Sequence, residues 1–253
     1  MKTLSISLII SGLLLYGCCR KCEMTILTDL HGPNFSNWEV VLGDGIYAAP
    51  GEAPVDSNDI ATINYPGYSE LIANIKNRRI QAHNITFNRI VNDTALTCVH
   101  DAEYSFKLPY FPSTSSVDYN GQTIEGGLFV WDGKNSKIDY GIAFQWIVNP
   151  WLDPIISIWN GTGWDKIGSL PLDSLYHVIK FTLDVQNKNA WLTLDGYEYP
   201  NNCFSKTKKP EFGPEIAARF QAEMISIYPP QTGFNPSHIA DFRDWKWRWT
   251  RCE

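Results

Sequence analysis

The sequence has little positive charge, and after its first residues it has no long apolar run. Its 253 residues include 21 Lys and Arg against 27 Asp and Glu, which gives a net charge of −6. An acidic chain of this kind does not suit nucleic acid or an anionic membrane as a partner. Repeats, low-complexity tracts and linkers are also absent from the sequence, so residues 23–253 are predicted to form a single domain.

Complete catalytic and metal-binding motifs are missing too. The sequence has no Gly-x-Ser-x-Gly elbow, no phosphate-binding loop and no pair of histidines at metal-ligand spacing. Cys18, Cys19 and Cys22 have no second Cys/His pair to complete a zinc site. No cofactor and no metal are therefore predicted. Calcium could still bind loop carboxylates such as Asp56 and Asp59, but no dedicated calcium loop is present.

The first residues have the pattern of a secretory signal peptide. Lys2 precedes an apolar run over residues 4–16, which is too short to span a bilayer as a mature helix. Residues 1–17 are predicted to be removed, and Leu-Tyr-Gly-Cys at 15–18 approximates a bacterial lipobox in which Cys18 would carry the lipid. The protein is therefore expected to be secreted or extracellular, either free or anchored to the cell surface through Cys18.

Short alternating segments separated by turn residues predict an all-β protein with antiparallel strands. The clearest is residues 176–196, where strands over 177–184 and 190–194 flank a polar turn and end at Asp195-Gly196. The spacing of Leu71, Ile72 and Ile75 is also compatible with a helix over residues 69–77. Strands are predicted over residues 38–42, 59–65, 79–88, 102–108, 122–131, 140–148, 155–159, 177–185, 190–194, 217–228 and 239–249.

Alternation along these strands separates an apolar face from a polar one. In residues 217–228, Phe220 and Met224 lie on one face, and Arg219, Gln221 and Glu223 lie on the other. The same parity rule gives several other strands a polar face, and a wet face of a curved sheet is where a ligand could lie. The candidate ligand-binding residues are Arg79, Gln81, Trp131, Gln145, Arg219, Gln221 and Glu223, with Glu125, Glu223 and His83 as candidate catalytic groups.

Several stretches together resemble the concanavalin A-like lectin/glucanase superfamily, which includes laminin G-like modules. They are Gly-Gly-Leu-Phe-Val-Trp at 126–131, residues 139–146, 156–159 and 176–196, and Ala-Asp-Phe-Arg-Asp-Trp at 240–245. The resemblance covers about residues 120–250 and lies in the pattern of strands. It implies a two-sheet antiparallel jelly-roll sandwich that binds or cleaves polysaccharides, with no subfamily identified.

The sequence departs from the enzymes of this superfamily. The Glu-x-Asp-x-x-Glu strand of laminarinase-type hydrolases is absent, and Gln81-Ala-His83 only approaches the Gln-x-His strand of certain alginate lyases. The preferred prediction is therefore a carbohydrate-binding protein that recognises a polysaccharide on its concave sheet. A polysaccharide lyase or glycoside hydrolase using Glu125, Glu223 and His83 in the same groove is the first alternative. A structural envelope or adhesion protein is the second.

Two further predictions concern disulfides and aromatic residues. Because jelly rolls commonly place their first and last strands side by side, the resemblance implies a disulfide between Cys22 and Cys252. Mid-strand tryptophans are predicted to fill the core, whereas loop tryptophans are candidates for stacking on a sugar. The first set is Trp146, Trp159 and Trp191, and the second is Trp151 and Trp164. His177 is predicted to be structural.

Overall fold

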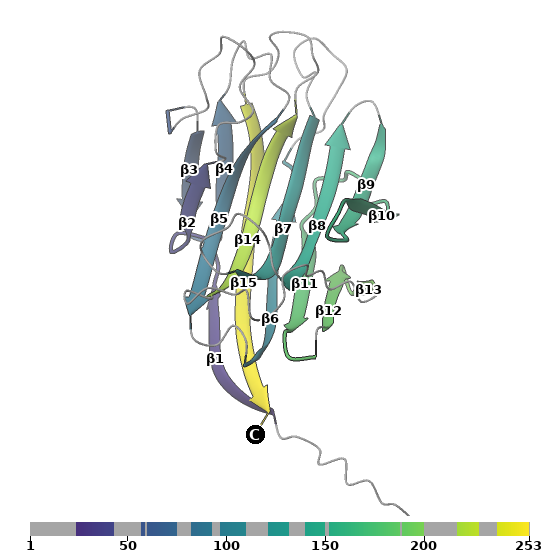
Figure 1. Cartoon of the computed structure of the whole chain (residues 1–253). Helices are drawn as coiled ribbons and strands as arrows, with labels where there is room; N and C mark the ends of the chain where they lie inside the picture. The colour runs from purple at the N-terminus through teal and green to yellow at the C-terminus, as the bar shows by residue number, and fades with distance from the viewer. Residues whose placement is uncertain are drawn as a thin grey trace, which may run out of the picture.

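The computed structural model describes residues 24–42, 57–58, 60–74, 82–92, 97–109, 121–131, 140–149, 152–187, 189–199, 217–227 and 237–252. These residues form two antiparallel β-sheets, one lying behind the other in Figure 1. The all-β prediction is confirmed, since the described residues contain strands and turns but no helix. Accordingly, no described helix has the length and hydropathy needed to cross a membrane.

Sheet A has eight strands in the order β13-β12-β11-β6-β15-β4-β3, with β1 also paired to β15. Its strands are β1 (Met24–Gly32), β3 (Ile60–Tyr65), β4 (Tyr68–Asn74), β6 (Val99–Lys107), β11 (His177–Asp184), β12 (Asn189–Leu194), β13 (Tyr197–Tyr199) and β15 (Ser237–Cys252). Sheet B has seven strands in the order β10-β9-β8-β7-β14-β5-β2. They are β2 (Glu39–Leu42), β5 (Ala82–Asn92), β7 (Gly121–Trp131), β8 (Tyr140–Asn149), β9 (Leu152–Trp159), β10 (Trp164–Gly168) and β14 (Ala217–Ile227).

The last two strands enter the middle of the two sheets. β14 lies between β7 and β5 in sheet B, and β15 lies between β6 and β4 in sheet A. Neither strand pairs with the strand that precedes it in the chain, so the connections cross from one sheet to the other instead of forming hairpins. This crossing pattern makes the fold a jelly-roll sandwich, as predicted.

The core is a layer of aromatic and aliphatic side chains between the sheets. The predicted alternation of β14 is confirmed, because Ala218, Phe220, Ala222 and Met224 are all fully buried. The Phe220 ring centre lies 5.0 Å from that of Trp38, 5.5 Å from that of Tyr104 and 5.8 Å from that of Trp247. Aromatic pairs at these separations stabilise a core beyond the area they bury.

β15 changes partner partway along its length. On one edge, its first half pairs with β4 and its second half pairs with β1. On the opposite edge it pairs with β6. The register shifts between Arg243 and Lys246, where Asp244 has a φ of 52°. A residue in this left-handed region is typical of a β-bulge. At the far end Met24 of β1 lies opposite Cys252, so the first and last described strands are neighbours.

Some sequence-based predictions of secondary structure are wrong. The segment compatible with a helix forms β4 instead, with Ser69, Leu71 and Ala73 buried alternately against sheet neighbours. β1, β10 and β13 were not predicted. The hairpin of β11 and β12 is confirmed, and Asp195 and Gly196 form a tight turn to β13 with φ values of 50° and 82°. Positive φ at both central residues is what a type I′ turn requires.

Candidate functional site

A row of polar side chains crosses the middle of sheet B. In the ladder, Glu223 of β14 lies opposite Thr86 of β5 on one side and Glu125 of β7 on the other. Glu125 in turn lies opposite Gln145 of β8, which lies opposite Ser157 of β9. Directly opposed residues share one face of a sheet. Since the alternate residues of β14 fill the core, this row lies on the outer face of sheet B.

Two carboxyl groups occupy the centre of this row. The β-carbons of directly opposed residues such as Glu125 and Glu223 are about 4.5–5.5 Å apart. Burial and the negative charge of Glu223 raise the pKa of Glu125 to about 8, although the hydrogen bond donated by Gln145 Nε2 to Glu125 Oε1 lowers it. Glu125 is therefore mostly protonated at neutral pH, next to a second carboxyl group on the neighbouring strand.

An open pocket of about 230 Å³ lies beside the two carboxyl groups, and we call it the carboxyl pocket. It is lined by Glu125, Gly126, Phe129, Ala143, Trp159, Trp164, Gln221 and Glu223. The residues come from strands β7, β8, β9, β10 and β14, which are neighbours in sheet B. The pocket is thus built on the strands of sheet B and not on loops.

One end of the carboxyl pocket is aromatic. Trp159 and Trp164 lie opposite each other on β9 and β10, with ring centres 5.4 Å apart in an edge-to-face arrangement. Phe129 and Ala143 pack with Trp159 in a small cluster separate from the main core. Trp164 remains 36% exposed, so part of its indole is available to a ligand.

A glycine in β7 makes room for the Phe129 ring at the aromatic end of the pocket. Gly127 lies between Gln221 and Ala143 in the ladder. A Cβ on Gly127 would be 2.2 Å from Cζ of Phe129 and 2.5 Å from the carbonyl oxygen of Ile142. Only glycine therefore allows the Phe129 ring to lie over this part of the strand.

The structure brings together several of the residues selected from the sequence. Three of them line the carboxyl pocket, namely Glu125, Gln221 and Glu223. Gln145 lies beside the pocket and donates a hydrogen bond to Glu125. Arg219 lies two residues before Gln221 on the same face, opposite Phe129, and does not line the pocket. Burial lowers the pKa of Arg219, while the nearby carboxylate of Glu39 raises it.

The structure does not place the side chains of four other residues that were selected from the sequence. Arg79 and Gln81 lie outside the described residues, as do the side chains of His83 and Trp131. The backbone of His83 lies opposite Ser226, whereas Thr86 lies opposite Glu223. The role of His83 as a candidate catalytic group stays a prediction.

The aromatic end was mostly missed by sequence reasoning. Trp159 lines the carboxyl pocket although it was predicted to be core, and Trp191 is half-buried on the outer face of sheet A. Trp146 is buried as predicted, and Trp151 lies outside the described residues. Alternation along β7 puts Phe129 on the face of Glu125, whereas Ala143 gave no signal in the sequence, because only the strand register brings it to the pocket.

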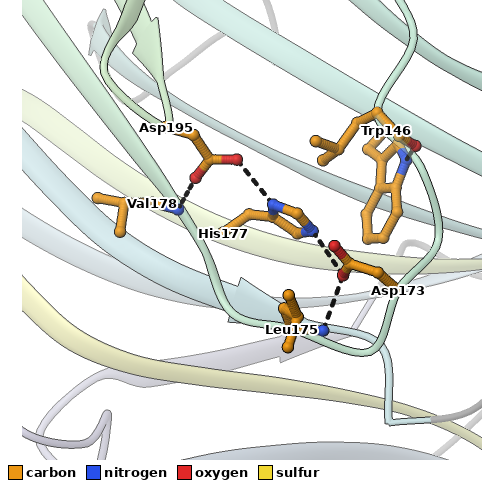
Figure 2. A network of polar contacts seen from close by, with 7 residues as sticks. Trp146, Asp173, Leu175, His177, Val178 and Asp195 are labelled. Atoms are coloured by element: carbon orange, nitrogen blue, oxygen red, sulfur yellow. Dashed lines mark hydrogen bonds and ion pairs between the residues drawn. The ribbon is translucent and has the colours of Figure 1, made fainter.

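His177, the first residue of β11, joins two loops at one end of sheet A. Figure 2 shows its imidazole between two carboxylates, with Nδ1 2.7 Å from Asp195 Oδ2 and Nε2 3.2 Å from Asp173 Oδ1. The same carboxylates accept hydrogen bonds from the backbone amides of Val178 and Leu175. His177 is buried and both ring nitrogens are used, so this network holds the turn after β12 against the loop before β11.

No metal centre is found among the residues described above: they contain no group of three or more His, Cys, Asp or Glu side chains that could hold an ion. Cys98 is buried and free, while Cys22 lies outside the described residues. The predicted Cys22–Cys252 disulfide therefore stays a prediction, although Cys252 lies opposite Met24 in the ladder.

No protein-family model and no curated protein sequence match the chain. Solved structures with a similar fold include a beta-1,3-glucanase from Mycobacterium marinum, at 13% identity and a TM-score of 0.47, covering 89% of this chain and 99% of the other. The winged bean acidic lectin complexed with methyl-alpha-D-galactose is similar at 13% identity and a TM-score of 0.45, over 91% and 100%.

A third similar structure is the CBM2 module of the evolved Dit of Lactobacillus casei BL23 phage J-1, at 13% identity and a TM-score of 0.49, covering 92% of this chain and 99% of the other. The chain also matches a sialidase at 7% identity and a TM-score of 0.46, over 75% of its own length but only 16% of the sialidase chain. All of these similarities have sequence identities of 13% or less and TM-scores below 0.5.

Proposed function

We propose that the protein binds carbohydrate in the carboxyl pocket, as a secreted or surface-anchored protein that recognises a polysaccharide or another glycan. The observation that carries this proposal is the placement of a partly exposed indole, Trp164, in the same pocket as Glu125, Gln221 and Glu223. A pyranose has an apolar C–H face and a rim of hydroxyl groups, so it needs both kinds of contact.

Each side of the carboxyl pocket has a distinct role in this proposal. The indole of Trp164 would pack against the C–H face of a sugar, with Trp159 holding that indole by its edge-to-face contact. Gln221 offers an amide, and the carboxyl groups of Glu125 and Glu223 offer further polar contacts to hydroxyl groups. The lectin, glucanase and CBM2 structures named above have the same fold.

The export part of the proposal rests on residues 1–18. The charged start, the apolar run and the Gly17-Cys18 junction match a signal peptide, with lipidation of Cys18 as the route to the cell surface. Mass spectrometry of the protein purified from its native membrane and medium fractions would test this. An acylated Cys18 would support an anchor, and an intact residue 1–17 segment would contradict export.

A glycan array followed by calorimetry with the retained glycan tests carbohydrate binding. Replacing Trp164 by Ala should weaken binding by about tenfold or more, and Gln221→Ala should cost about 1–3 kcal/mol, because both side chains line the pocket. Trp191→Ala is the matched control, because Trp191 is a half-buried indole on the outer face of the other sheet. Equal losses in the Trp164 and Trp191 variants, or no retained glycan, would contradict the proposal.

A glycan-active enzyme is the second candidate, and the raised pKa of Glu125 favours it. A protonated carboxyl group next to an ionised one is the pairing that glycoside hydrolysis uses for acid and nucleophile or base. Reducing-end and unsaturated-product assays on the glycans retained by the array would detect hydrolysis or lyase activity. Turnover that Glu125→Gln and Glu223→Gln both abolish would establish the enzyme; binding without turnover would leave a binding protein.

A further inference from the structure

We propose that the carboxyl pocket holds one sugar residue that carries an N-acetyl group, so that the protein prefers N-acetylhexosamine glycans over glycans with hydroxyl groups alone. This inference rests on the proposed carbohydrate binding and adds the chemical class of the ligand. It follows from an apolar floor, made by Phe129 and Ala143, that lies next to the polar side chains of Glu125 and Gln221 in the same pocket.

The apolar floor of the pocket is not part of the protein core. Phe129 and Ala143 lie on the outer face of sheet B and form, with Trp159, a small apolar cluster apart from the main core. Gly127 allows the Phe129 ring to lie over β7 at this point. The hydroxyl groups of a sugar gain nothing from such a surface, whereas a methyl group that packs on it is removed from water. The floor therefore indicates a ligand with an apolar substituent.

The polar side of the pocket has a hydrogen-bond donor at a fixed place. Nε2 of Gln145 donates to Oε1 of Glu125, which leaves Oε2 as the oxygen that carries a proton. The raised pKa of Glu125 keeps that proton in place at neutral pH. The protonated acid would donate to the carbonyl oxygen of an acetamido group, and the side-chain carbonyl of Gln221 would accept from the N–H of that group. An acetamido group offers this acceptor and this donor side by side.

The apolar floor and the polar groups are one step apart along the strands. Glu125 lies two residues before Gly127 on β7, and the Phe129 ring lies over Gly127. In the ladder, Gly127 has Gln221 on one side and Ala143 on the other. Successive rows on one face of a sheet lie about 6.5–7 Å apart. An acetamido group whose carbonyl oxygen meets Glu125 would therefore place its methyl group on the floor.

The size of the pocket fits a single sugar ring. Its volume of about 230 Å³ lies below the range of roughly 300–1,000 Å³ that is typical of sites for drug-sized ligands. The exposed part of the Trp164 indole lies at the aromatic end, where the C–H face of the ring would pack, with Trp159 beside it. We therefore expect one residue of a glycan to enter the pocket, so a methyl glycoside is a sufficient probe.

Saturation-transfer NMR with matched pairs of methyl glycosides tests the inference. Each pair, in the gluco, galacto and manno series, differs only in an acetamido group that replaces the hydroxyl group next to the anomeric carbon. In at least one pair we expect the N-acetylated glycoside to bind about tenfold more tightly, because burial of the methyl group and the added hydrogen bonds each contribute several-fold. The acetyl methyl protons should receive the strongest saturation, since they would lie against Phe129 and Ala143.

Two pocket variants and one control locate the effect. Ala143→Val fills part of the floor and Gln221→Leu removes the amide, and each should reduce the preference for the N-acetylated glycoside to less than about threefold. Ala217→Val is the matched control and should keep the full preference, because Ala217 shares the alternation of Gln221 on β14 but does not line the pocket. Thermal melting shows whether each variant is folded, and having two pocket variants keeps the test valid if one of them is not.

The outcomes separate this inference from the proposed function. Equal affinity within every pair, or a full preference retained in both folded pocket variants, would overturn the selection of the acetamido group and leave carbohydrate binding standing. Tighter binding of methyl fucoside, a deoxy sugar whose methyl group is attached to the ring, would overturn it in the same way. The inference is also wrong if array glycans bind but no N-acetylated glycoside does. If no glycoside and no array glycan binds, both proposals are wrong.

Discussion

Replacing Phe220 by Ala should destabilise the protein strongly, whereas replacing its neighbour Gln221 should not. The Phe220 side chain is 0% exposed and contacts the rings of Trp38, Tyr104, Phe181 and Trp247. Truncation of a buried Phe costs about 3–5 kcal/mol in lost transfer free energy and in the cavity left behind. The four aromatic neighbours cannot all move inward to fill the cavity, so we expect a loss in the upper half of that range.

Urea and thermal unfolding followed by circular dichroism would measure this difference. A loss of about 4–5 kcal/mol should lower the melting temperature by roughly 8–20 °C in a domain of this size. Gln221→Ala, on the opposite face of β14, should stay within about 0.5 kcal/mol of the parent. If the Gln221 variant lost as much stability as the Phe220 variant, the assignment of the two faces of β14 would be refuted.

Three other predictions concern the proton on Glu125, the hydrogen-bond network of His177 and the Cys22–Cys252 disulfide. The free energy of unfolding in urea should fall as pH rises from about 4.5 to about 8, because the folded state keeps the Glu125 proton that the unfolded chain loses. Glu125→Gln should flatten this pH profile. An unchanged slope in that variant would contradict the raised pKa of Glu125. His177→Ala should lower the free energy of unfolding by about 1–3 kcal/mol and speed hydrogen exchange at the Val178 amide, while exposed His31→Ala should do neither. Non-reducing peptide mapping should join Cys22 to Cys252, and a Cys22–Cys98 link would count against it.

The sequence was sufficient to predict the faces of individual strands. In β14 the alternation is complete, and each apolar residue from Ala218 to Met224 is buried as predicted. β15 follows the same rule, with Trp245, Trp247 and Trp249 buried and Lys246 exposed. A period of two fixes which side chains share a face, because successive side chains of a strand point in opposite directions.

The alignment of one strand with another could not be predicted in the same way. Glu125 and Glu223 become opposed only because β14 inserts next to β7 after a long connection, and nothing in either segment encodes that pairing. β4 was open to a helix because a short apolar run such as Leu71-Ile72 fits both periods.

The pairing of β1 with the end of β15 determines how the protein would respond to mechanical force. Met24 and Cys252 are ladder partners, so a pull on the two ends of the described chain acts across the first rung and not along the strands. Backbone hydrogen bonds of antiparallel strands lie perpendicular to the strands, so they would open one after another, as in a zipper. The bulge at Asp244, where β15 passes from β1 to β4, would be the point at which this peeling meets the rest of sheet A.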